Sequence, residues 1–175
     1  MRWLNTEQHY GWAMVMIHWL VAGTIFSMFA FGIWMVDLDY YHGWYKKGPD
    51  LHRSIGVVVL VVMALRFGFR IFNPPPALEQ NLSSLERFGS ILVHWLFYVM
   101  IVLIATTGYL ITTADGRGLL VFDLIEIPAI SLDIKNQEDL AGEVHWYLAL
   151  VMMALASVHV LAAVKHHLID KDRTL

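Results

Sequence analysis

The stretch EVHWYLALVMMALASVHVLAAVKHH (residues 143–167) places His145, Met152, His159 and His166 at intervals of seven residues. Residues 144–164 contain no Asp, Glu, Lys or Arg, and a helix of this length crosses a bilayer. His145 and His159 are 14 residues apart, so their imidazoles share one helix face, about 21 Å apart along the axis. Because histidine is costly inside a membrane, two stacked imidazoles indicate a functional site, whereas Met152 is expected to fill the core.

The rest of the chain also has the composition of a membrane protein. Of its 175 residues, 58 % are hydrophobic and 15 % are charged, and the mean hydropathy is +0.56. Residues 11–36 and 88–114 are further uncharged runs that exceed the roughly 20 residues a membrane helix needs. Residues 51–72 include arginines, but those near the two ends can extend their charged groups toward the membrane surfaces.

This pattern predicts an all-α integral membrane protein with four transmembrane helices in an antiparallel bundle. We expect one domain over residues 1–175, with helices at about 11–36, 51–72, 87–113 and 140–166. The first helix is too long for a cleaved signal peptide and is preceded by a single cation, Arg2.

The distribution of charge predicts the orientation of this bundle. Four spans place both termini on the same side of the membrane, and that side carries seven of the twelve Lys and Arg residues. The positive-inside rule therefore predicts that the N and C termini are cytoplasmic. The opposite side carries ten of the fifteen acidic residues, so its net charge is negative.

Five histidines fall at two depths of the predicted bundle. His52 and His145 begin the second and fourth helices, so we expect them near the outer surface. His18, His94 and His159 are expected near the inner surface. Opposed imidazoles ligate b-type haem, and a chain without cysteine cannot attach haem covalently. The pattern predicts two haems b, one held by His52 and His145 and the other by His18 and His159.

Glycine and arginine occur at the same two depths. Gly32 and Gly108 fall at the outer level, where a missing side chain leaves room for a flat macrocycle, although glycine is also common in ordinary helix packing. Arg66 falls at the inner level, where it would pair with a haem propionate or, alternatively, with a lipid phosphate. A single membrane histidine is often only a hydrogen-bonding contact between helices, but five at two depths favour haem.

Two histidines have more than one interpretation. His94 would replace an inner haem ligand, pack structurally or line a quinone site. His166 lies one heptad beyond His159, beside His167 at the membrane exit. Imidazole titrates near neutral pH, which suits a site where quinone takes up protons with electrons. The alternative for His166 is a favourable cation at a helix C-terminus.

Several short motifs resemble those of the bacterial cytochrome b561 family. They are His18-Trp19-Leu20, Leu51-His52 followed by Gly56, Arg66 and Arg70, then His94, Glu143-Val144-His145, His159, and the closing His166-His167, Lys171-Asp172 and Thr174-Leu175. The resemblance covers nearly the whole chain. It implies four helices, two b haems with the same ligand pairs, and electron exchange with the quinone pool. It also implies that His94 and His166 are quinone-side residues.

The resemblance further implies a bacterial inner-membrane, multi-pass protein whose partners are membrane lipid and quinone, not nucleic acid. One branch of the family consists of superoxide:ubiquinone oxidoreductases, in which electrons from periplasmic superoxide reach ubiquinone through both haems. That branch implies an enzyme with no catalytic residue beyond the haem. The alternative is an electron-carrying cytochrome b subunit. It would serve a dehydrogenase or a small periplasmic quinone- or lipid-binding protein, and the negative outer surface favours such a donor over an anion.

Overall fold

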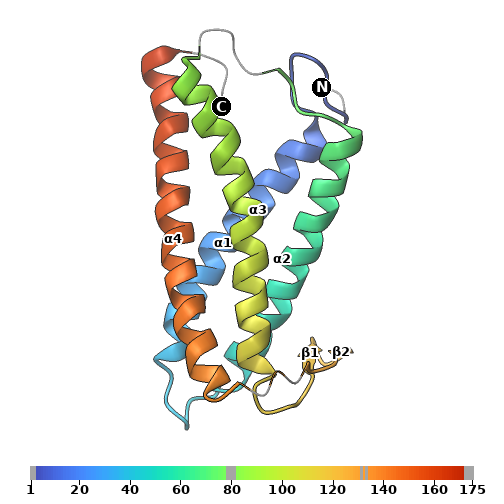
Figure 1. Ribbon diagram of the computed structural model, residues 1–175, viewed down its shortest axis with the longest axis vertical. Coiled ribbons are helices and arrows are strands. Elements are labelled where there is room, and N and C mark those ends of the chain that lie inside the picture. The colour runs from blue at the N-terminus through green and yellow to red at the C-terminus, as the bar shows by residue number, and fades with distance from the viewer. Residues whose placement is uncertain (1–2, 78–81, 131, 133, 172–175) are drawn as a thin grey trace.

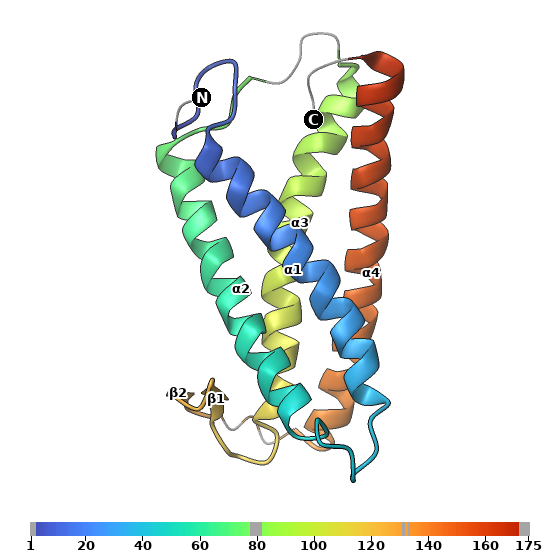
Figure 2. The same ribbon diagram turned by 180° about the vertical axis from the view of Figure 1, so that it is seen from behind.

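The computed structural model describes residues 3–77, 82–130, 132 and 134–171, and four long helices make up most of them. Their bounds are α1 Trp12–Val36, α2 Lys47–Phe72, α3 Ser84–Thr112 and α4 Gln137–Lys165, and a π-helical turn, η1 His166–Asp170, continues α4. Each helix is long and apolar enough to cross a membrane. The predicted four-helix membrane bundle is therefore confirmed. Its most oblique member is α1, which runs from beside one end of α2, across α3, toward the opposite end of α4 (Figures 1 and 2).

Three helices begin three or four residues before the predicted bounds, because polar residues form their first turns. At α3, the Ser83 hydroxyl accepts from the Glu86 backbone N–H at 3.3 Å, and the Glu86 carboxylate accepts from the Ser83 backbone N–H at 3.0 Å. This reciprocal pair satisfies two N–H groups that a helix start otherwise leaves open. At α2, Pro49 lies in the first turn, where its missing N–H costs no helical hydrogen bond.

The two ends of the bundle differ in structure. Both ends of the described chain and the α2–α3 connection lie at one end, here called the termini end (Figure 1). The α1–α2 loop and the α3–α4 connection lie at the other, the hairpin end. There β1 (Leu119–Val121) pairs antiparallel with β2 (Ile125–Ile127), a short sheet that the sequence analysis did not predict. In the three-residue loop between them, Phe122 and Asp123 have left-handed φ angles of 50° and 58°, and the Leu124 backbone N–H donates to the Val121 carbonyl oxygen at 3.0 Å.

Methionine and aliphatic side chains form the middle of the bundle. The buried cluster consists of Val21, Met63, Met100, Ile101 and Met152. Met152 is only 2 % exposed, so its prediction as a core residue is confirmed. It lies seven residues from both His145 and His159, and the flexible thioethers thus fill the space between the two histidine levels.

Candidate haem sites

Four histidines form two opposed pairs at different depths. Near the hairpin end, the ring centroids of His52 on α2 and His145 on α4 are 6.3 Å apart, and the rings cross at 67°. Nearer the termini end, His18 on α1 and His159 on α4 are also 6.3 Å apart and cross at 64°. The structure thus brings together the residues of both predicted pairs.

The separation within each pair suits one metal ion between two imidazoles. Two imidazoles that bound one metal ion through bonds of about 2.0 Å could have ring centres up to about 6.3 Å apart. His94 also lies against His159, at a centroid distance of 5.5 Å and an interplanar angle of 85°. His159 therefore has two imidazole neighbours, and its 6.3 Å separation from His18 equals that between His52 and His145.

His145 is held by hydrogen bonds from α3. Its Nδ1 lies 3.0 Å from the carbonyl oxygen of Ile104 and 3.1 Å from the hydroxyl oxygen of Thr107. When Nδ1–H donates to these oxygens, the lone pair of Nε2 is left for a metal, and the ring orientation is fixed. The sequence analysis missed Thr107. Its position beside Gly108 was the available signal, but Thr107 and His145 are 38 residues apart.

His52 is held by packing. The ring of Phe31 stacks on it at a centroid distance of 6.2 Å and an interplanar angle of 17°. Its Nδ1 is buried and, within the described part of the chain, has no hydrogen-bond partner. The two histidines of this pair therefore have different surroundings: one has a hydrogen-bonded Nδ1 and the other does not.

Both predicted glycines lie against the imidazoles of this pair. A Cβ on Gly32 would come within 3.3 Å of the His52 Cε1, and a Cβ on Gly108 within 3.4 Å of the His145 Cε1. The Gly32 contact is closer than ordinary van der Waals packing, and the Gly108 contact lies at the lower limit of such packing. The missing side chains thus leave room for these two imidazole rings, while clearance for a macrocycle at the same glycines stays a prediction.

The pair nearer the termini end has a basic and aromatic environment. His94 Nδ1 lies 2.6 Å from the carbonyl oxygen of Ser90, to which it donates in the tautomer with Nδ1–H. The Phe97 ring lies edge-on to His159 at 5.4 Å. The Nε of Arg66 is buried and has no hydrogen-bond partner among the described residues. A guanidinium in this position fits an anionic group such as a haem propionate, because a buried cation needs a counter-charge.

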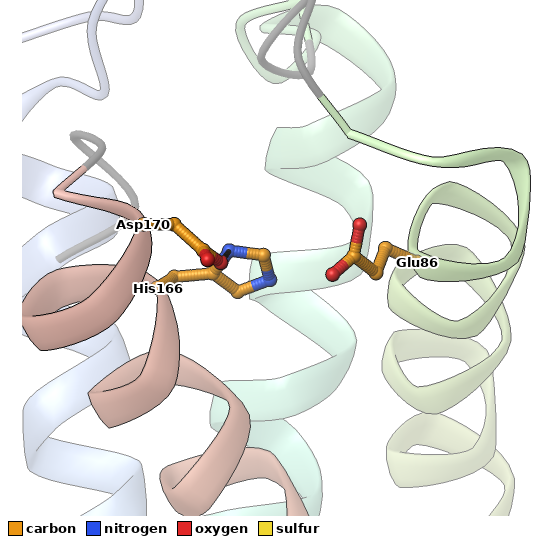
Figure 3. Close-up of side chains that lie close together, drawn as sticks. All are labelled: Glu86, His166 and Asp170. Atoms are coloured by element: carbon orange, nitrogen blue, oxygen red, sulfur yellow. Dashed lines mark ion pairs between the residues drawn. The ribbon is translucent and has the colours of Figure 1, made fainter.

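His166 belongs to a polar cluster at the termini end, separate from the four paired histidines. Its Nδ1 lies 2.9 Å from the Asp170 carboxylate, and the Lys165 Nζ lies 2.8 Å from Asp170 and 2.7 Å from Glu86. Figure 3 shows the imidazole between the Asp170 and Glu86 side chains. Although three of these groups are close enough to share a metal ion, the Lys165 ammonium already bridges both carboxylates. The cluster is therefore an ion-pair network that joins η1 to the start of α3.

Comparison with known proteins identifies the family of this histidine-bearing bundle. Residues 9–175 match the family described as Prokaryotic cytochrome b561. The chain belongs to that family. The resemblance seen in the sequence is thereby confirmed, and with it a b-type haem and a role in membrane electron transfer.

Individual b561 relatives match most of the chain. The chain is 41 % identical over 175 residues to cytochrome b561 homolog 2 of Escherichia coli (strain K12). The match covers 100 % of this chain and 93 % of the relative. The chain is 26 % identical over 174 residues to a Yersinia pestis protein named probable superoxide oxidase CybB. That match covers 97 % of this chain and 94 % of the relative. The chain is also 26 % identical over 149 residues to cytochrome b561 homolog 1 of Escherichia coli (strain K12). That match covers 76 % of this chain and 79 % of the relative.

The contact at Gly32 predicts that Gly32→Leu lowers the haem content of this cytochrome, because the new side chain occupies the space of the His52 ring. The haem-to-protein ratio of purified protein, measured as the pyridine haemochrome, should fall. Gly23→Leu is the matched control on α1, since a Cβ there meets nothing within 4 Å. Equal haem content in the two variants would contradict the assignment of this contact.

Proposed function

We propose that this cytochrome transfers electrons across a bacterial inner membrane, from a donor at the hairpin end to ubiquinone at the termini end, and that it holds two b haems. The observation that carries the proposal is the pair of opposed imidazole sites, each with centroids 6.3 Å apart, at two depths. Bound haem b supplies reversible one-electron chemistry. His52 with His145 and His18 with His159 are the proposed axial ligands.

The remaining residues of each site orient these ligands and balance charge. Ile104 and Thr107 fix the ring of His145, while Phe31 and Gly32 confine that of His52. Arg66 is the proposed partner of a propionate near the termini end. The buried methionines between the two levels exclude water, which keeps the dielectric low around both sites.

The quinone side is proposed at the termini end. His94 supports this placement because its half-buried ring adjoins His159. His166 lies farther toward this end of the bundle. Its ring contacts the Asp170 carboxylate, which also contacts the Lys165 ammonium. Imidazoles at such positions can donate the protons that quinone reduction consumes. The cation bias of the sequence supports a cytoplasmic location for this end, with both termini inside.

Superoxide is the first candidate donor, supported by the printed name of the Yersinia pestis relative. A partner protein is the second, supported by two features of the hairpin end. Two of its cations are engaged by neighbouring acids, Arg53 by Asp50 and Arg117 by Asp115, which weakens attraction for an anion. The α1–α2 loop also exposes a cluster of aromatic rings suited to docking, namely Tyr40, Tyr41, Trp44 and Tyr45.

The ligand assignment predicts that His52→Ala and His145→Ala each remove the same haem. The pyridine haemochrome should then show about one haem per chain in place of two, because one imidazole does not hold the site. His42→Ala is the control, since His42 is exposed. Two haems per chain in both ligand variants would refute the pair.

The hydrogen bond at His145 predicts a change in redox potential. A donated Nδ1–H makes the ligand more basic and favours the oxidised iron, so Thr107→Val should raise the midpoint potential of one haem. Haem affinity at that site should fall about tenfold. Thr107→Ser keeps the hydroxyl and should restore both properties. Redox titration of the optical bands checks this, and matching potentials for the valine variant and the parent would exclude the role.

The two donor candidates differ in a stopped-flow experiment. If superoxide is the donor, a pulse of superoxide should reduce the haem of the purified protein within the lifetime of the pulse, and superoxide dismutase should abolish the signal. Ubiquinone should then reoxidise it. If dithionite reduces the haem but superoxide does not, a partner protein is the better candidate for the electron donor.

A further inference from the structure

We propose that the β1–β2 hairpin is a membrane-interface anchor whose apolar turn lies among the lipid headgroups and upper acyl chains beside α2. The hairpin connects α3 to α4 but packs sideways on α2. Figures 1 and 2 show it next to the last turns of the bundle and level with them. The proposal concerns a lipid contact and is independent of the haem assignment.

The hairpin is firmly attached to α2. Leu119 and Val121 on one face of β1 are buried, at 3 % and 8 % exposure. The backbone N–H of Phe122 donates to the hydroxyl of Ser54 at 2.9 Å, and that hydroxyl donates to the carbonyl oxygen of Asp50 at 2.7 Å. Ser54 itself is 2 % exposed. These contacts fix the turn of the hairpin at the level of Ser54.

Ser54 marks the depth at which the apolar part of α2 begins. The charged pair of Asp50 and Arg53 immediately precedes it, and residues 54–65 carry no Asp, Glu, Lys or Arg. In a membrane helix, such a change from charged to apolar residues occurs at the boundary between headgroups and acyl chains. The hydrogen bond to Phe122 therefore holds the turn at this boundary.

The side of α2 that receives the hairpin is its lipid-facing side. Val58, Val61 and Leu65 follow Ser54 at helical spacing and are 42 %, 52 % and 68 % exposed. In a bilayer, these side chains contact acyl chains. Because the hairpin covers the start of the same stripe, it occupies a position that lipid would otherwise fill.

The turn has the side chains that such a position requires. Phe122, Leu124 and Ile125 are 47 %, 84 % and 64 % exposed. Asp123 and Glu126 are also exposed, so the hairpin cannot lie in the hydrocarbon core, where a carboxylate is costly. This mixture of apolar and acidic side chains fits the interface, because the apolar side chains can enter the acyl region and the acidic ones can reach the headgroups.

Site-directed spin labelling tests this proposal, because the chain has no cysteine and each introduced cysteine is the only one. A nitroxide at Leu124→Cys is compared in lipid nanodiscs with labels at Val61→Cys, on the lipid-facing stripe, and Lys135→Cys, an exposed cation of the same connection. Power saturation measures collisions with oxygen, which concentrates in lipid, and with a water-soluble nickel chelate. We expect the oxygen-to-nickel ratio at Leu124 to be several-fold above that at Lys135 and below that at Val61, which lies deeper in the bilayer.

The same measurement at Ile125→Cys provides a second position if the Leu124 variant does not fold. A ratio that matches Lys135 at the turn would overturn the proposal, because the turn would then be in water. Low collision rates with both reagents would also overturn it, since they indicate burial against protein. In Ser54→Ala, which lacks the hydroxyl that fixes the turn, the label should become more mobile and its oxygen-to-nickel ratio should fall.

Discussion

The structure depends on holding two pairs of imidazoles close together inside an apolar bundle. Each ring is a polar group in a place where water cannot solvate it, so its position must be fixed by neighbours or by a ligand. Both pairs share one helix, α4, which contributes His145 and His159. The 14-residue spacing on that helix sets the vertical distance between the sites, and the crossing of α1 and the tilt of α2 bring their partners to the same levels.

The parts of this architecture that could be predicted are those that depend on the order and spacing of residues along the chain. Uncharged runs reveal membrane helices, and equal spacings on alternating helices reveal which histidines share a depth. The pairing of His52 with His145 follows from that logic alone. Helix starts were less predictable, because the first turns of α2, α3 and α4 use polar residues that resemble loops in composition.

Other parts depend on how the helices rotate and pack, which spacing does not reveal. Thr107 reaches His145 across an interhelical contact, and Phe31 reaches His52 in the same way. The hairpin was hidden for a different reason. Its turn uses Phe122 and Asp123 in the left-handed conformation, and although aspartate is common in turns, phenylalanine is not and no glycine follows. Contacts to α2 compensate for this unfavourable backbone.

Because α4 follows the other three helices in chain order and supplies one imidazole to each pair, neither site is complete until α4 has entered the bilayer. During synthesis, His18 and His52 are therefore present in a partly assembled bundle before their partners His159 and His145 reach it. Both histidine pairs are then completed by the same late step, the packing of α4 against the other helices.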